Sequence, residues 1–203
     1  MILYEKGHGL YLNLTNRCPV ACRFCVKVPW EYEFEGHDLS IEGPEPTAED
    51  LIAALKEKLT KDAPWREVVF CGFGESTYRL KEMTEVGLHL KTHHPEVKVR
   101  LNTVGLGSLI WDRDIAPELA RFLDEVAVSL NTADPRQWVD LLRPAPSYRE
   151  KGFAASRLFA ENCVAAGIRT RVTAVELPEV DLKPLEKYAQ KIGADFTARP
   201  TLD

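Results

Sequence analysis

The chain has 203 residues, of which 45% are hydrophobic and 28% charged, with 12 glycines and 13 prolines. This composition is typical of a globular protein and excludes collagen-like, low-complexity and mainly disordered chains. Lysine and arginine number 26 against 31 acidic residues, a formal net charge of −5, so nucleic acid is not an expected partner. The length predicts a single domain over residues 1–203.

No apolar run reaches the roughly 20 residues that a membrane-spanning helix requires. The first residues, 1–7, lack the charged and apolar regions of a signal peptide. Five cysteines are present, and three of them lie close together. Such clustering favours a metal site in a reducing compartment over a disulfide framework. We therefore expect a cytoplasmic protein with no membrane segment.

Strands and helices are predicted to alternate along the chain. Apolar, β-branched runs predict strands at residues 10–15, 67–71, 98–102, 125–130, 171–175 and 195–198. Apolar residues at helical spacing predict helices after a Thr47–Asp50 capping box and around residues 80–90, 119–123, 155–166 and 182–192. A further strand at residues 2–5 is expected to fold back across the turn at residues 7–9.

This alternation predicts an α/β fold of βαβ units around a parallel sheet. Six units give an open, partial (β/α)6 barrel that is TIM-barrel-like; a doubly wound sheet is the alternative. A closed eight-stranded barrel typically needs about 250 residues, which this chain does not have. In both remaining architectures, we expect the functional site at the carboxyl ends of the strands.

Two stretches interrupt the alternation. Residues 26–46 form a long, acidic, aromatic-rich connection, and a connection of this length is usually functional or mobile. Its Trp30, Tyr32, Phe34 and His37 are candidates for a lid over the site. Residues 134–149 contain a helical piece that ends at a Pro-Ala-Pro sequence.

The strongest chemical signal is Cys18-Pro-Val-Ala-Cys22-Arg-Phe-Cys25, which directly follows the first predicted parallel strand. Three thiolates on one short loop can converge on a small metal centre. A 4Fe–4S cluster usually takes four cysteines, so three would leave one iron with a free position. The alternatives are a zinc site completed by His8, His37 or Cys71, and three buried cysteines with no metal.

These cysteines resemble the motif of the radical S-adenosylmethionine (SAM) superfamily, in which an aromatic residue, here Phe24, precedes the last cysteine. Cys71-Gly-Phe-Gly-Glu75 is similar to the family's Gly-Gly-Glu motif, with Phe73 inserted and Ser76 where proline is commoner. Leu101-Asn-Thr-Val-Gly105 resembles the Thr-Asn-Gly element, and Ser129-Leu-Asn131 stands at the ribose-binding position. The fifth parallel strand lacks the family's Gly-x-Ile-x-Gly pattern.

Within that superfamily, the chain is most similar to the small TatD-linked radical SAM proteins. The likeness rests on the short length, Asn13-Leu-Thr-Asn-Arg-Cys18, Glu45-Pro-Thr47 and the two motifs ending at Glu75 and Asn131. It implies a functional link to a TatD-type nuclease and identifies no substrate.

The superfamily resemblance implies a 4Fe–4S cluster on Cys18, Cys22 and Cys25, with SAM chelating the fourth iron. An electron from a flavodoxin- or ferredoxin-type partner would cleave SAM to methionine and a 5′-deoxyadenosyl radical. That radical would abstract hydrogen from an unknown small-molecule or protein substrate. The cofactors would supply this chemistry, and the protein would position them.

The resemblance also implies a set of residues around SAM. These are Phe24 on the adenine, the turn Gly72, Phe73, Gly74 and Glu75 at the amino group, Ser129 and Asn131 at the ribose, Arg143 at the carboxylate, and Asn102 as a further contact of SAM. Four of them have a structural alternative: Phe24 in the core, Asn102 within its own loop, Asn131 in a turn, and Arg143 in a surface ion pair. Cys71 is either a small buried residue or a fourth cluster ligand, and Cys163 is expected in the core.

Other functions remain open at this stage. A non-catalytic iron–sulfur protein for electron transfer or sensing would need a fourth protein ligand and no SAM, and a zinc-stabilised domain would need no iron. Among enzymes, a glycyl-radical activase or a small-molecule enzyme like 7-carboxy-7-deazaguanine synthase fits a chain without a second cysteine-rich region.

Overall fold

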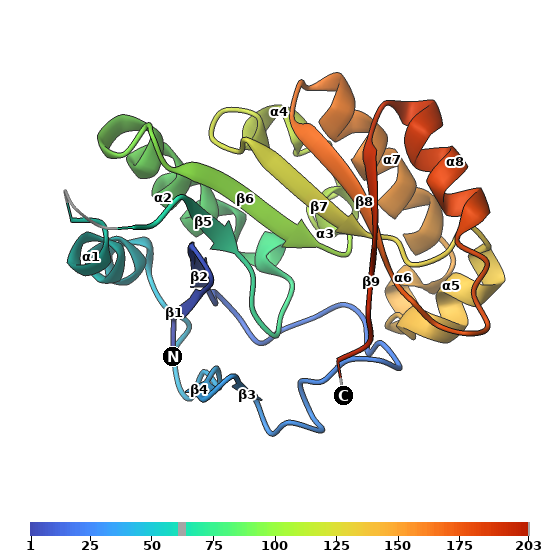
Figure 1. Cartoon of the computed structure of the whole chain (residues 1–203), viewed down its shortest axis with the longest axis horizontal. Helices are drawn as coiled ribbons and strands as arrows, with labels where there is room; N and C mark the ends of the chain where they lie inside the picture. Colours follow the sequence, from blue (N-terminus) through green and yellow to red (C-terminus); the bar gives the residue numbers. More distant parts are fainter. Residues whose placement is uncertain (61–63, 203) are drawn as a thin grey trace.

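The computed structural model describes residues 1–60 and 64–202. Seven strands form one curved sheet in the order β1-β2-β5-β6-β7-β8-β9 (Figure 1). Their bounds are β1 (Leu3–Lys6), β2 (Gly9–Leu12), β5 (Glu67–Phe70), β6 (Lys98–Thr103), β7 (Glu125–Ser129), β8 (Arg169–Val175) and β9 (Asp195–Arg199). Strand β1 pairs antiparallel with β2, and each following neighbour is parallel. The predicted α/β fold with a parallel sheet of six strands and a folded-back first strand is confirmed.

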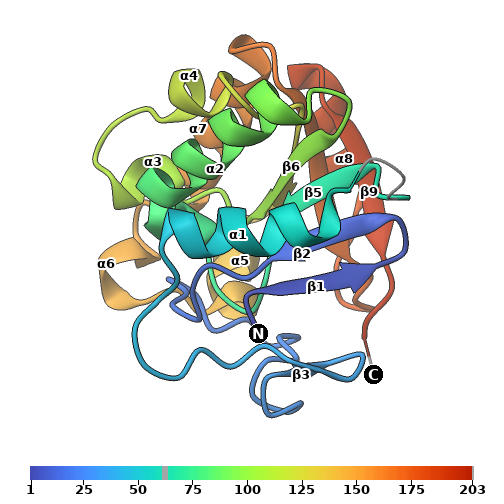
Figure 2. The same cartoon turned by 90° about the vertical axis from the view of Figure 1, so that its left-hand side faces the viewer.

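The helices follow the strands in alternation and lie along the outer side of the curved sheet (Figures 1 and 2). They are α1 (Ala48–Lys58), the 3-10 helix η1 (Ser76–Arg79), α2 (Leu80–His93), α3 (Gly107–Ile110), α4 (Ala116–Leu119), α5 (Pro135–Leu142), α6 (Pro146–Arg149), α7 (Gly152–Ala165) and α8 (Lys183–Ile192). The predicted capping box is present, because Thr47 Oγ1 accepts from the Asp50 amide and the Asp50 carboxylate accepts from the Thr47 amide. None of the helices in the described ranges is long and apolar enough to cross a membrane.

One predicted helix is shorter than its apolar spacing suggested. Only Ala116–Leu119 is helical, and the buried Phe122 and Leu123 lie in the turn that follows. Both side chains reach the core from this turn. The helix-like spacing of these apolar residues therefore reflects their burial and not a longer helix. The predicted core position of Cys163 is confirmed, because this residue is fully buried on α7.

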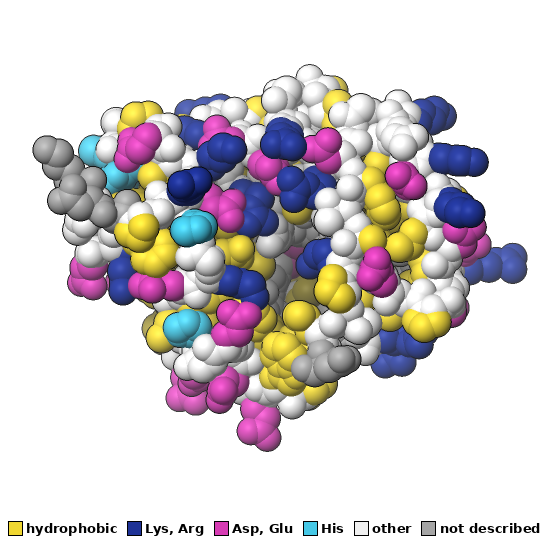
Figure 3. All heavy atoms as spheres, viewed as in Figure 1, with side chains coloured by type: hydrophobic (Ala, Val, Ile, Leu, Met, Phe, Trp, Pro, Cys, Tyr) yellow, Lys and Arg dark blue, Asp and Glu magenta, His cyan; other side chains and the backbone are white. Residues whose placement is uncertain are grey.

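The two faces of the sheet differ in chemistry. Alternate residues such as Leu12, Phe70 and Leu101 pack in one core with helix residues of α1 and α2. This places the helices on one face, as in an open partial barrel, and not on both faces as in a doubly wound sheet. The opposite, concave face carries polar side chains such as Arg100, and the molecule is hollowed in the view of Figure 3.

The long connection at residues 26–46 contains a two-stranded ribbon, β3 (Glu33–Phe34) and β4 (His37–Asp38). It lies along the open side of the sheet, below β1 in Figure 1. Asn13 and Asn16 fix its far end, since the side-chain amide of each donates to the Leu39 carbonyl, at 2.8 and 3.0 Å. The segment is therefore tied to the stretch that carries the cysteines.

Candidate functional site

The three clustered cysteines lie on a loop that leaves the carboxyl end of β2. Backbone hydrogen bonds hold this loop against the end of α5: the Ala21 amide donates to Leu142 at 3.0 Å, and the Arg23 amide donates to Leu141 at 2.9 Å. On the other side, the Ala145 amide donates to the Pro19 carbonyl at 2.9 Å. Packing from a distant helix therefore sets the position of the loop.

The thiols of this loop occupy a partly apolar setting. Cys18 and Cys22 are half-buried and pack against the second core, whereas Cys25 is exposed. Burial raises the pKa of Cys18 to about 12, although a hydrogen bond with the Val20 backbone acts to lower this pKa. Burial also raises the pKa of Cys22. The raised pKa values disfavour the thiolates in the metal-free chain, and a bound metal supplies the positive charge that stabilises them.

The donor set fits a soft metal centre. The loop offers three sulfurs, which are the donors that iron–sulfur clusters use. In the described ranges 1–60 and 64–202, no three His, Cys, Asp or Glu side chains are grouped closely enough to hold one metal ion. A 4Fe–4S cluster differs from a single ion in that each cysteine binds a different iron, so it does not require the three sulfurs to meet at one atom. Cys71 has different neighbours from the three clustered cysteines. Its thiol faces the Tyr4 hydroxyl and the Asn102 amide, and burial raises the pKa of this thiol.

The glycines of the turn after β5 serve close packing within the chain. A Cβ on Gly72 would lie 2.1 Å from Asn13 Oδ1, and one on Gly74 would lie 2.2 Å from the Thr15 carbonyl oxygen. The turn can therefore lie against the end of β2 and the start of the cysteine loop only because both residues lack a side chain. Asn13 Oδ1 is itself buried without a hydrogen-bond partner.

Glu75 is the last residue of this turn, and its side chain lies in the protein interior. Its side chain is buried, and one carboxylate oxygen accepts from the Thr77 hydroxyl at 2.7 Å and the Thr103 hydroxyl at 2.8 Å. The other oxygen accepts from the Val104 amide at 2.8 Å. Burial raises the pKa of Glu75, and these hydrogen bonds oppose that rise. The carboxylate thus joins β5 to the end of β6, and its predicted contact with an ammonium group stays a prediction.

Phe73, the residue that separates the two glycines, contacts the 26–46 segment. Its ring meets Tyr32 edge-on at 6.1 Å between centroids and Phe34 at 6.5 Å. Phe34 in turn lies 6.0 Å from Tyr4 of β1. The inserted aromatic therefore docks the long connection onto the glycine turn.

The polar residues predicted on β6 and β7 have partners within the chain. Asn102 Oδ1 accepts from Arg100 at 2.8 Å, and Ser129 Oγ lies 3.2 Å from Thr173 Oγ1. Asn131 is 1% exposed, donates to the Ser129 carbonyl and accepts from the Val175 amide. With a φ of 65°, Asn131 closes a left-handed turn. This is the structural alternative considered for it, and a ribose contact would require exchanging both bonds.

Phe24 and Arg143 differ in their surroundings. Phe24 is half-buried and packs against the second core. Arg143 ends α5 in a left-handed conformation, is exposed, and lines a surface pocket of about 550 Å³ with Arg23 and Arg149. None of the cysteines or residues of the glycine turn lines that pocket, and contacts of Phe24 and Arg143 with SAM stay predictions.

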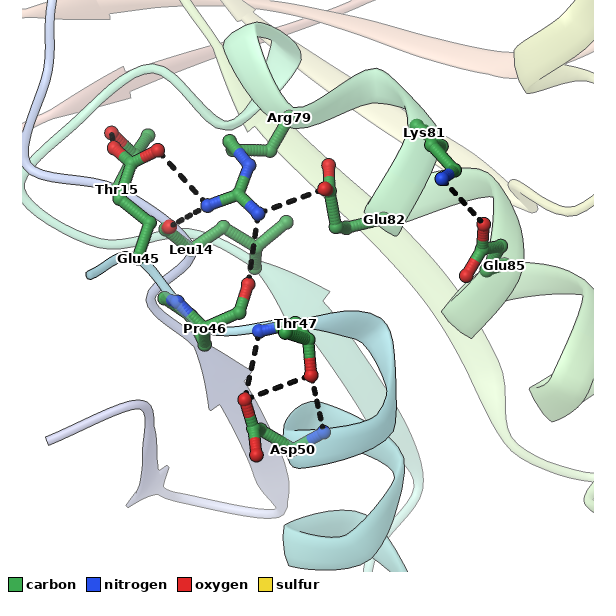
Figure 4. Close-up of polar contacts among 10 residues, drawn as sticks. All are labelled: Leu14, Thr15, Glu45, Pro46, Thr47, Asp50, Arg79, Lys81, Glu82 and Glu85. Atoms are coloured by element: carbon green, nitrogen blue, oxygen red, sulfur yellow. Dashed lines mark hydrogen bonds and ion pairs between the residues drawn. The ribbon is translucent and has the colours of Figure 1, made fainter.

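Sequence reasoning did not identify Arg79, which links three segments near the site (Figure 4). Its guanidinium contacts Glu45 at 2.9 Å, Glu82 at 2.8 Å and the Pro46 carbonyl at 2.9 Å. Glu45 also accepts from the Thr15 hydroxyl. The network connects the end of the 26–46 segment to the stretch before the cysteines and to α2. No local pattern signals the contacts with Glu45 and Pro46, because both residues are distant in sequence, whereas Glu82 lies only three residues from Arg79.

Several solved structures share this fold at low sequence identity. SuiB from Streptococcus suis bound to its precursor peptide SuiA gives a TM-score of 0.71 at 17% identity, covering 98% of this chain and 40% of SuiB. SuiB bound to S-adenosylmethionine gives 0.70 at 16% identity, covering 95% of this chain and 40% of SuiB. A radical SAM methyltransferase from Sphaerobacter thermophilus gives 0.62 at 16% identity, covering 98% of this chain and 68% of the other.

The chain thus spans about 40% of the length of the SuiB structures. No curated protein sequence matches it. The family model described as the radical SAM superfamily matches residues 12–192. This range includes the cysteine loop, the glycine turn, the last residue of β2 and the whole of β5, β6, β7 and β8. The first three residues of β2 and all of β9 lie outside it. The chain belongs to the radical SAM superfamily.

Proposed function

We propose that this chain is a radical SAM enzyme with a 4Fe–4S cluster on Cys18, Cys22 and Cys25. The observation that carries the proposal is the placement of three thiols on one short loop at the carboxyl end of the first parallel strand. That loop is held from α5 by backbone hydrogen bonds, and the family match spans it. Three cysteines leave one iron of the cluster without a protein ligand.

When bound, the reduced cluster and SAM supply a 5′-deoxyadenosyl radical and methionine, and that radical abstracts hydrogen from the substrate. The protein's part is to hold the partners and exclude water. Asn13, Gly72 and Gly74 keep the turn after β5 against the cysteine loop. The half-buried Phe24 and the aromatic side chains of residues 26–46 limit access of water from the open side.

The surroundings of Cys71 favour this enzyme over a four-cysteine electron carrier or sensor. Its thiol faces Tyr4 and Asn102 on the concave face, so it already has partners within the sheet. The electron donor proposed for the enzyme is a flavodoxin- or ferredoxin-type protein, because the cluster must be reduced by one electron. Membership of the TatD-linked group, and with it a link to a TatD-type nuclease, rests on the sequence motifs alone.

The test is a spectroscopic titration of the reconstituted, reduced chain with SAM under anaerobic conditions. SAM chelating an iron is expected to change the electron paramagnetic resonance signal of the cluster, and S-adenosylhomocysteine serves as a comparison ligand that also carries the amino and carboxylate groups. A four-iron signal that neither ligand alters would contradict SAM binding and support an electron carrier. A chain that binds zinc and assembles no iron–sulfur cluster would contradict both.

A further inference from the structure

The concave face of the sheet carries four arginines on its parallel strands, and three of them are neutralised there. Arg100 makes two bonds to Glu67, at 3.0 and 2.8 Å. Arg171 pairs with Glu125 at 3.1 Å, and Arg169 pairs with Asp195 at 3.0 Å. The register of β5 to β9 sets these pairs, because the partners lie on neighbouring strands. In each pair the carboxylate neutralises the arginine, so these three arginines attract an anionic ligand only weakly.

Arg199, at the carboxyl end of β9, differs from the other three. Its guanidinium donates to Ser129 Oγ at 3.2 Å and so reaches across β8 to β7. Across residues 1–60 and 64–202, no Asp or Glu oxygen lies within 4.0 Å of this guanidinium. The Arg199 side chain is exposed, so a ligand can reach it.

The surroundings of Arg199 favour an anion. Ser129 Oγ lies 3.2 Å from Thr173 Oγ1; where the buried Thr173 hydroxyl donates to Ser129, the Ser129 hydroxyl keeps its own hydrogen for a ligand beside the guanidinium. The protein removes water from the guanidinium and thereby lowers the pKa of Arg199, and the ionisable group that faces it is the Cys71 thiol. An exposed guanidinium with no carboxylate partner among the described residues is stabilised by an anionic ligand, and guanidinium binds carboxylate or phosphate through paired hydrogen bonds.

We propose that Arg199, with the Ser129 hydroxyl that Thr173 holds in place, binds an anionic group of the substrate, a carboxylate or a phosphate. The three residues stand at the carboxyl-end half of β7, β8 and β9, the end at which the cysteine loop leaves β2. Assigning the anion to a substrate rests on the proposed function. Binding of the anion itself requires neither cluster nor SAM.

The first test measures how fast phenylglyoxal modifies individual arginines of the full reconstituted chain, read by peptide mass spectrometry. Glutarate and inorganic phosphate are the probes, compared with chloride at equal ionic strength. Labelling of Arg199 is expected to slow about threefold or more and to saturate, as it does when a ligand fills most sites. Arg121, exposed on the outer side of the molecule, is the internal control and should react at an unchanged rate.

The two probes distinguish the sources of the anion: protection by glutarate alone assigns a carboxylate, and protection by phosphate alone assigns a phosphate. Equal protection of Arg199 and Arg121, or none at either, overturns the proposal. SAM forms a third arm, because it also carries a carboxylate. Protection of Arg199 by SAM would assign the residue to the cofactor and overturn its assignment to the substrate.

The second test uses three variants, Arg199→Lys, Arg199→Gln and Arg121→Gln, and the rise in Tm that the protecting anion produces. At roughly ten times its Kd, the anion should raise the Tm of the wild type and of Arg121→Gln by about 3–6 °C. Arg199→Lys should keep part of this rise, and Arg199→Gln should lose it while keeping its Tm in chloride. A full rise in Arg199→Gln overturns the proposal. Neither test measures SAM cleavage. Anion binding at Arg199 can therefore be confirmed or refuted even if the chain does not cleave SAM.

Discussion

Glu75 accepts the hydroxyl of Thr103 at 2.8 Å, and this bond connects the glycine turn after β5 to the end of β6. Both residues are buried, with exposed fractions of 2% and 4%. The acidic residue of the Gly-Phe-Gly-Glu turn thus stabilises the very part of the sheet on which a cofactor would lie. Its position depends on Thr77 of η1 and on Thr103 and Val104 at the end of β6.

The Glu75→Gln variant should lose about 2 kcal/mol of unfolding free energy, because an amide NH2 group would face the Val104 amide or the two threonine hydroxyls. Denaturant unfolding of the metal-free chain measures this loss. Glu57→Gln, on the exposed side of α1, is the matched control and should change little. A Glu75→Gln chain as stable as the wild type would show that the carboxylate serves only a ligand.

Phe73→Ala should loosen the 26–46 segment without unfolding the sheet, because it removes the ring that meets Tyr32 and Phe34. The amide of Leu39, which donates to Tyr32 at 2.8 Å, should exchange its hydrogen about tenfold faster. Hydrogen exchange read by mass spectrometry gives the rate. Phe153→Ala, on α7, is the control and should leave exchange in this segment unchanged. Equal exchange in Phe73→Ala and wild type would place the docking contact elsewhere.

The Arg79–Glu82 pair predicts a stability that depends on acid pH. Arg79 lowers the pKa of Glu82, so the folded chain holds this carboxylate ionised to a lower pH than the unfolded chain does. The stabilisation is therefore complete above the ordinary glutamate pKa of about 4.3 and is lost as pH falls through the lowered value. Relative to Glu82→Gln, the wild type should be more stable at pH 7 by about 1 kcal/mol, and the difference should vanish near pH 3.

Unfolding free energies measured across that pH range check this prediction. Glu85→Gln on the same helix is the control, since Glu85 lies 3.9 Å from Lys81 and is 45% exposed (Figure 4). A difference between wild type and Glu82→Gln that persists unchanged at pH 3 would contradict the ion pair as its source.

Cys71→Ala should retain the iron content of the wild type, because the Cys71 thiol faces Tyr4 and Asn102 and is not needed as a cluster ligand. Iron and acid-labile sulfide are measured after anaerobic reconstitution. Cys22→Ala is the contrasting variant and should lose most of both. Loss of the cluster in Cys71→Ala at wild-type folding would make Cys71 a fourth ligand and contradict the radical SAM proposal.

The sequence predicted the strands well because their buried faces are continuous apolar runs. Strand β8 begins at Arg169, two residues before its prediction, since Arg169 and Arg171 are polar side chains of the concave face paired with Glu125 and Asp195. Charged residues inside a strand weaken the apolar signal. Their function as ion-pair partners depends on neighbours that lie far away in sequence.

Some parts of the candidate site could be predicted from the sequence and others could not, because many of its contacts join residues that are far apart in sequence. Spacing alone identified the cysteine loop, because three thiols within a few residues carry a local chemical signal. The distant partners of Glu75 and Asn131 could not be predicted, since Thr103 and Val175 lie on other strands and Val104 directly follows β6. The contacts of Gly72 and Gly74 with Asn13 and Thr15 could not be predicted either, because these residues are far apart in sequence.

The most direct test of the central claim is formation of 5′-deoxyadenosine by the reconstituted chain with dithionite and SAM, quantified by mass spectrometry under anaerobic conditions. The wild type and a Cys163→Ala variant, altered only in the core of α7, should both form deoxyadenosine, and Cys22→Ala should form none. A wild-type chain that holds four irons per molecule and leaves SAM intact would contradict the proposed radical SAM activity.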